Sequence, residues 1–108
     1  MPKKHRVIIL PAAKEMLSMH ARFLKRESLG AAHRLMSGYG KSIARIADNP
    51  FQFPFADELD IPNITPNTYR KCLFEIRYKA LFRIKEGNAF VVAIIDSRME
   101  NMDALGEY

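Results

Sequence analysis

Basic side chains recur in the last third of this sequence, within or next to short runs of residues with strand character. They are Arg70, Lys71, Arg77, Lys79, Arg83, Lys85 and Arg98. Lysine and arginine on adjacent strands form a rigid cationic surface, which can hold phosphates and stabilise negative charge that develops on one. An ordinary solvated sheet face has a similar composition. From these residues alone, phosphate chemistry and simple solvation both stay open.

Other chemistries have less support. The stretch GYGKS at 38–42 is similar to part of a phosphate-binding loop, but that motif needs a glycine where Leu35 stands, and it should follow a strand. The three histidines share no metal-ligand spacing with one another or with Cys72. We therefore expect no metal site and no cofactor, and we expect Cys72 to be a small buried hydrophobic residue.

The elements that must position the basic side chains follow from the apolar periodicity. We predict helices at 12–26 and 29–48, a connection at 50–68, and strands at 5–10, 69–74, 78–85 and 89–95. The two helices should form a hairpin. The expected fold is α+β in a single domain spanning 1–108, with an antiparallel sheet of about four strands and the N-terminal helix hairpin packed on one face.

The connection at 50–68 contains four prolines and no strong helical pattern. A connection of this length inside a compact domain is usually functional or folded over another part of the molecule. We expect Phe51, Phe53 and Phe55 to pack against the edge of the sheet.

The last two strands can be aligned by assuming a two-residue turn at Gly87-Asn88. This register places Lys79 opposite Asp96 and Arg77 opposite Arg98. One face is then apolar and consists of Tyr78, Ala80, Phe82, Ile84, Val91, Ala93 and Ile95. The other face is expected to be basic and open, and consists of Arg77, Lys79, Leu81, Arg83, Val92, Ile94, Asp96 and Arg98. Arg98 would join Arg77 and Lys79 at one end of the sheet.

Composition and charge limit the class of protein. The chain has 108 residues, 48% of them hydrophobic, and a formal net charge of +5. Residues 1–49 carry ten basic and three acidic side chains, and 69–98 carry seven and three, whereas 50–68 and 99–108 each carry three acids and no base. Two basic blocks favour a polyanionic partner, either nucleic acid or an acidic protein, over a merely soluble basic surface. No apolar run is long enough for a signal peptide or membrane span, so we expect a cytoplasmic protein without membrane contact.

The residues from 69 onward, YRKCLFEIRYKALFRIKEGNAFVVAIIDSRMEN, resemble the RelE/ParE superfamily of type II toxin–antitoxin toxins, a group that includes plasmid stabilisation proteins. The similar pattern is Tyr-basic-x-hydrophobic-aromatic-basic-hydrophobic at 78–84, followed by a hydrophobic strand that ends at Arg98. The order of one strand, a helix hairpin and three strands is also similar. The resemblance implies a toxin that is bound by an acidic cognate antitoxin.

Toxins of the RelE type cleave mRNA on the ribosome without metal, through attack of the 2′-hydroxyl on the neighbouring phosphorus. The resemblance assigns catalytic roles to Arg98, Lys79 and Arg70, and we expect RNA-binding roles for Arg77, Arg83 and Lys71. Four positions depart from the pattern. Arg70 stands, conservatively, where a lysine is usual. Lys79 stands where arginine is usual, Cys72 replaces a second upstream lysine, and Ala104 stands where a tyrosine is expected, with only Tyr108 nearby.

These departures leave the target open. The function that the resemblance favours is a ribosome-dependent mRNA endoribonuclease that inhibits translation. The ParE branch keeps the scaffold, lacks the full nuclease set and inhibits DNA gyrase. A third possibility is a toxin-like fold that only binds its antitoxin or nucleic acid.

Overall fold

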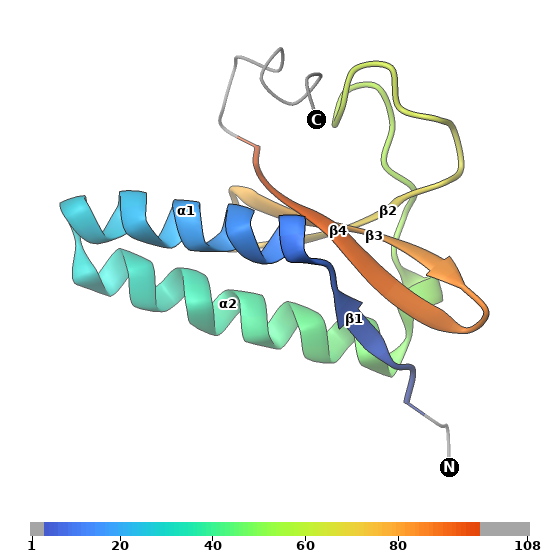
Figure 1. The fold of residues 1–108 in the computed structure, drawn as a ribbon, viewed down its shortest axis with the longest axis horizontal. Helices are drawn as coiled ribbons and strands as arrows, with labels where there is room; N and C mark the ends of the chain where they lie inside the picture. Colours follow the sequence, from blue (N-terminus) through green and yellow to red (C-terminus); the bar gives the residue numbers. More distant parts are fainter. Residues whose placement is uncertain (1–3, 98–108) are drawn as a thin grey trace.

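The computed structural model describes residues 4–97 and contains two helices and a four-stranded sheet. The elements in chain order are β1 (Val7–Ile9), α1 (Pro11–Glu27), α2 (Leu29–Asp48), a 3-10 turn (Pro50–Gln52), β2 (Arg70–Phe74), β3 (Tyr78–Lys85) and β4 (Asn88–Asp96). The strand order is β1-β4-β3-β2, and the helices precede β2, β3 and β4 in the chain. The predicted α+β fold with a helix hairpin is confirmed (Figure 1).

The sheet is mixed, whereas we expected it to be antiparallel. β2, β3 and β4 pair antiparallel, but β1 lies parallel to β4, with Ile8 opposite Phe90. The apolar pattern of a short strand gives its existence and not its direction. In the chain, the two helices and the β2–β3 hairpin separate β1 from β4. This long connection lets β4 return beside β1 in the same direction, as a parallel pair requires.

A single residue, Ser28, separates the helices and explains the tight hairpin. Its N–H donates to the carbonyl of Leu24 at the end of α1, and its Oγ accepts from the N–H of Ala31 in the first turn of α2 at 3.1 Å. Serine is a favoured N-cap residue because its side chain satisfies one of the free N–H groups there. Pro11 begins α1, where its missing N–H costs nothing.

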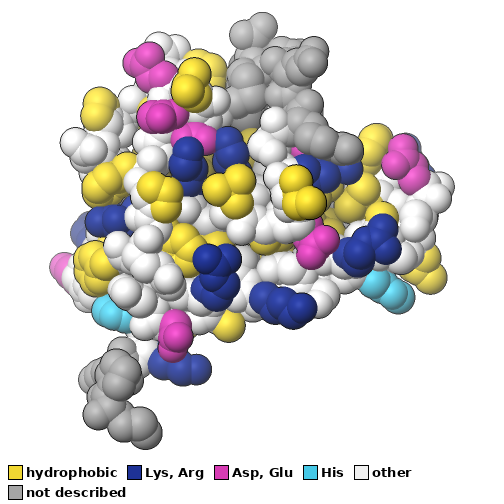
Figure 2. All heavy atoms as spheres, turned by 180° about the vertical axis from the view of Figure 1, so that it is seen from behind, with side chains coloured by type: hydrophobic (Ala, Val, Ile, Leu, Met, Phe, Trp, Pro, Cys, Tyr) yellow, Lys and Arg dark blue, Asp and Glu magenta, His cyan; other side chains and the backbone are white. Residues whose placement is uncertain are grey.

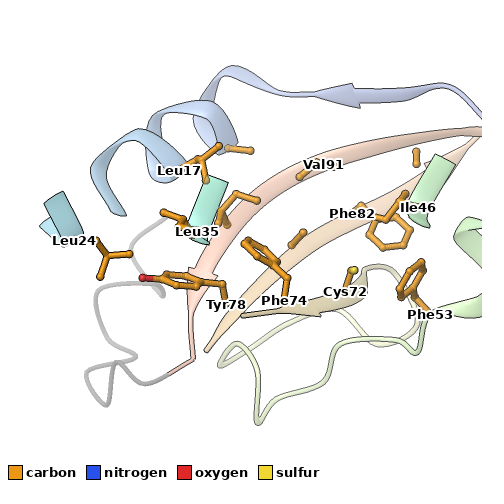
Figure 3. Close-up of a cluster of buried hydrophobic side chains, with 14 of the residues drawn as sticks. Leu17, Leu24, Leu35, Ile46, Phe53, Cys72, Phe74, Tyr78, Phe82 and Val91 are labelled. Atoms are coloured by element: carbon orange, nitrogen blue, oxygen red, sulfur yellow. The ribbon is translucent and has the colours of Figure 1, made fainter. Parts of the chain in front are cut away.

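The helix hairpin covers one face of the sheet and encloses the main core. Figure 3 shows Leu17 and Leu24 of α1 and Leu35 of α2 directed toward Phe74 and Tyr78 of the sheet. The buried apolar residues of the two helices recur at helical spacing, as the periodicity predicted: Ala13, Leu17 and Leu24 in α1, and Ala32, Leu35 and Ile46 in α2. Phe23 and Met36 are exposed. No helix in the described part of the chain is long and apolar enough to cross a membrane.

The register predicted for β3 and β4 is wrong. The turn residues are Glu86 and Gly87, both with positive φ, and Lys85 pairs with Asn88. A bulge then shifts the register between Leu81 and Phe82. In a two-residue turn of this kind both central residues need positive φ, and glycine at the second position meets that need.

The bulge exchanges the faces of β4 beyond Val91. Ile94 lies opposite Ala80 in the main core, and Ile95 lies opposite Lys79 on the other face. We had expected the reverse for both isoleucines. Asp96 pairs with Tyr78 in the register, not with Lys79.

The connection at 50–68 covers part of the second face of the sheet, which we expected to be open. Residues 54–56 run along the edge of β2, where the N–H of Ala56 donates to the Tyr69 carbonyl at 2.7 Å and Lys71 N–H donates to the Pro54 carbonyl at 2.9 Å. A second apolar cluster then joins the connection to the sheet. It contains Ala56, Leu81 and Ile95, with Ile61, Ile64, Tyr69, Val92 and Ala93 packed against them.

Candidate functional site

Two of the predicted site residues, Lys71 and Lys79, share the sheet face away from the helices and converge on one carboxylate. Lys71 lies opposite Leu81 and Lys79 opposite Leu73, so the two lysines are diagonal neighbours on β2 and β3. Lys71 Nζ donates to Asp60 Oδ2 at 2.8 Å and to Oδ1 at 3.1 Å, and Lys79 Nζ donates to Oδ1 at 2.5 Å. We call these three residues the Asp60 clasp.

The clasp is largely withdrawn from solvent. The Asp60 side chain is 2% exposed, that of Lys79 16% and that of Lys71 21%. Burial alone would raise the pKa of Asp60, but the hydrogen bonds from Lys71 and Lys79 outweigh it and hold the pKa at about 2. The carboxylate is therefore ionised at neutral pH, and the clasp carries a net charge of one positive unit.

A tight turn holds Asp60 in place. The N–H of Asp57 donates to Asp60 Oδ2 at 2.9 Å, and the N–H groups of Asp60 and Ile61 both donate to the Asp57 carbonyl. The Asp57 side chain accepts from the N–H of Leu59. Ile61 then packs against the second apolar cluster, which fixes the turn above the two lysines.

The geometry of the clasp suits an anion with two oxygens. Two ammonium groups from adjacent strands each reach an oxygen of one group, which is also how they would hold the two non-bridging oxygens of a phosphodiester. In this state the Asp60 carboxylate fills that place. Among residues 4–97, no group of three or more His, Cys, Asp or Glu could hold a metal ion.

Arg83, predicted to bind RNA, lies on the same face of β3 as Lys79, two residues beyond Leu81 along the strand. It is exposed and makes no ion pair with any other described residue. Its guanidinium is therefore available to a phosphate beside the clasp.

Arg70, predicted to be catalytic, does not lie beside Lys79. It pairs with Phe82 in the register and so belongs to the helix side of β2. Its Nη1 donates to the Phe53 carbonyl at 2.7 Å, and its guanidinium carbon lies 4.2 Å from the centre of the Phe55 ring and 5.7 Å from that of Phe51. Phe53 is buried as expected, whereas Phe51 and Phe55 are partly exposed around Arg70.

Arg77, also predicted to bind RNA, lies on the helix side, whereas we expected it beside Lys79. It lines a cleft of about 140 Å³ together with Leu24, Ala31, Arg34, Leu35, Glu75 and Tyr78. Its Nη2 donates to Asp96 Oδ2 at 2.6 Å, which raises the pKa of Arg77. The preceding residues Glu75 and Ile76 both have positive φ, so the regular alternation of the strand does not extend back to Arg77.

Cys72 does not add a basic group to the site. Cys72 is fully buried in the main core, as expected, and burial raises the pKa of its thiol although Arg45 opposes this. A neutral, buried thiol cannot replace a lysine. Arg98, Ala104 and Tyr108 lie outside the described residues.

Asp60 is the residue that sequence reasoning missed. The signal was present in the charge pattern, because the connection at 50–68 carries three acids and no base between two basic blocks. An acidic connection beside basic strands can neutralise them, but the sequence does not show which of Asp57, Glu58 and Asp60 does so.

Space-filling Figure 2, which views the molecule from behind Figure 1, shows lysine and arginine side chains distributed among hydrophobic ones, with acidic side chains between them. The visible surface is therefore mixed and not a continuous basic field. No protein-family model matches the sequence, and no curated protein is significantly similar to it.

Proposed function

We propose that this chain is the toxin of a type II toxin–antitoxin module and acts in the cytoplasm as a ribosome-dependent, metal-independent mRNA endoribonuclease. One observation carries the proposal: Lys71 and Lys79 extend from neighbouring strands to a single point where each can bind an oxygen of the same anion. The α+β architecture agrees with the family that residues 69–98 resemble.

In the proposed reaction the 2′-hydroxyl of the RNA attacks the adjacent phosphorus and the 5′-oxygen leaves. Lys79 and Lys71 would donate hydrogen bonds to the non-bridging oxygens, where negative charge increases in the transition state. Arg83, exposed on the same face, would hold a neighbouring phosphate. We also propose that Arg98 binds a phosphate bidentately through its planar guanidinium. Arg98→Lys should then recover little of the activity that Arg98→Ala removes.

The proposed partner is an acidic antitoxin encoded with the toxin. Its acidic side chains would be attracted by the basic blocks at 1–49 and 69–98, and packing beside the sheet would supply most of the affinity. The complex should form more slowly at high salt because salt screens this attraction.

Induced expression tests the target, with Lys79→Met as the site variant and Lys14→Met as the control. Both substitutions remove one positive charge, but Lys14 is an exposed residue of α1. We expect the wild-type chain and Lys14→Met to stop translation and leave transcripts cut at ribosome-protected positions, mapped by primer extension. Lys79→Met should cleave on the order of 100- to 1000-fold more slowly.

A second candidate, inhibition of DNA gyrase, is favoured by a different observation. The Asp60 carboxylate offsets the positive charge of Lys71 and Lys79. Arg70 lies on the other side of β2, and Cys72 is buried. A gyrase inhibitor does not need a set of basic residues gathered at one catalytic site. Continued translation with intact mRNA and loss of supercoiling activity after induction would support this candidate and contradict the nuclease.

A further inference from the structure

We propose that Asp60 is an internal competitor for phosphate at Lys71 and Lys79. The loop that carries Asp60 closes the site in the free protein and moves away from the two lysines when RNA binds. This inference rests on the proposed function, because it concerns the regulation of the same lysine pair. It predicts that the clasp is a closed state of the site and not only a structural ion pair.

Access to the lysines is the first argument. Each ammonium group is hydrogen-bonded to Asp60, and the lysine side chains are only 16% and 21% exposed. A phosphodiester, which is flanked by two nucleosides, cannot reach both ammonium groups while Asp60 lies between them. The segment that carries Asp60 must therefore move before the pair can bind RNA.

The construction of the segment is the second argument. Residues 57–68 form a loop whose ends are brought together by the hydrogen bond between Ala56 N–H and the Tyr69 carbonyl. None of these residues belongs to the main core cluster. Ile61 and Ile64 hold the loop on the sheet, whereas Leu59 is 90% exposed. The loop can be displaced without opening the core between the helices and the sheet.

Exchange of one anion for another is the third argument. With Asp60 removed, Lys71 and Lys79 would face each other without a counter-charge, which is unfavourable in a partly buried site. A phosphate in the same place restores two charge-assisted contacts. The main cost of the exchange is then the loss of the contacts of Ile61 and Ile64 with the second cluster.

The first test compares Asp60→Asn with Glu58→Gln. Both variants remove one carboxylate from the same loop, but Glu58 is exposed and makes no ion pair with a described residue. Binding is measured with a single-stranded RNA carrying 2′-O-methyl groups, which cannot undergo attack by a 2′-hydroxyl. We expect Asp60→Asn to bind about tenfold more tightly than wild type, and Glu58→Gln to change affinity much less.

The second test uses the wild-type chain, so that it stands even if Asp60→Asn does not fold. Hydrogen exchange is followed with and without the same RNA. Opening of the loop should accelerate exchange at the N–H groups of Asp57, Asp60 and Ile61, which are bonded within the turn. The core strand amides of β3 and β4 should not change.

The outcomes separate the two proposals. If wild type binds RNA while the loop amides stay protected, the internal-competitor inference is wrong and the proposed function stands. The same conclusion follows if folded Asp60→Asn binds no better than Glu58→Gln. If neither wild type nor Asp60→Asn binds RNA, while both are folded, the internal-competitor inference is wrong, and the cleavage of transcripts on the ribosome after induction decides the proposed function separately.

Discussion

At the scale of single residues, one aspartate changes the meaning of the basic sheet face. Lys79 was expected on an open face and Lys71 was expected to bind RNA, but each donates to the buried carboxylate of Asp60. Arg77 and Arg70 are likewise engaged, by Asp96 and by the Phe53 carbonyl. Arg83 is the predicted RNA-binding residue that the described part of the chain leaves exposed and without an ion pair. Residue type showed which side chains could bind phosphate, and the contacts show which of them are occupied.

Lowering the pH should reduce the free energy of unfolding, because Asp60 is stabilising in its ionised form. Its pKa falls from 3.8 to about 2 in the folded chain, so folding favours the ionised carboxylate. This stabilisation is fully present above about pH 4 and is lost as the pH falls through about 2. The expected contribution is about 2 kcal/mol. Urea unfolding between pH 7 and pH 2 measures it.

The control for this titration is Asp60→Asn, which lacks the ionisable group. Its free energy of unfolding should be lower than that of wild type at pH 7, and the difference should shrink as the pH approaches 2. A difference that stays constant over this range would show that Asp60 stabilises the fold in a way that does not depend on its charge.

At the scale of elements, two of the three glycines in α2, Gly38 and Gly40, differ in their surroundings. A Cβ at Gly38 would lie 2.7 Å from Cγ of Glu75, whereas a Cβ at Gly40 would meet nothing within 4 Å. Glycine inside a helix costs roughly 1 kcal/mol relative to alanine. The close contact of α2 therefore lies at Gly38, with the turn before β3.

We expect Gly40→Ala to raise the free energy of unfolding by about 0.5–1 kcal/mol. Gly38→Ala should gain less or lose stability, because the Glu75 side chain must move away from the new methyl group. Urea denaturation of both variants gives the comparison. An equal gain at both positions would mean that Glu75 moves aside without cost.

The elements differ in how well the sequence predicted them. The bounds of α2 and β3 were predicted to the residue and those of α1 within one residue, because their apolar periods extend over two turns or eight strand residues. The bulge at Leu81/Phe82 was not predictable from the same pattern. Val91 to Ile95 are all apolar, so either alternation leaves hydrophobic residues on both faces.

The site was less predictable than the fold for a related reason. Asp60 reaches Lys71 and Lys79 only because residues 54–69 run back along β2 and over the sheet. Such a path depends on tertiary packing of Ile61 and Ile64, which a proline-rich connection without a period does not reveal.

At the scale of the whole molecule, the effect of net charge on RNA binding can be distinguished from the effect of where a basic residue lies. The net charge of +5 would attract RNA to many parts of the surface, whereas the proposed site lies on one face of the sheet. Arg83 and Arg22 are both exposed, but Arg83 lies on the strand beside the clasp and Arg22 on α1, where it pairs weakly with Glu15 at 3.6 Å. Replacing either with alanine removes the same charge.

If the sheet face binds RNA, Arg83→Ala should weaken binding of a single-stranded RNA and reduce the slope of log affinity against log salt by about 0.7, the value for one phosphate contact on a single strand. Arg22→Ala should lower the affinity only slightly and leave the slope unchanged, because it alters the overall field without removing a contact. Binding titrations at several salt concentrations measure both. Equal effects of the two substitutions would indicate that RNA is attracted by net charge alone, and a larger effect of Arg22→Ala would place the contact on the helix hairpin.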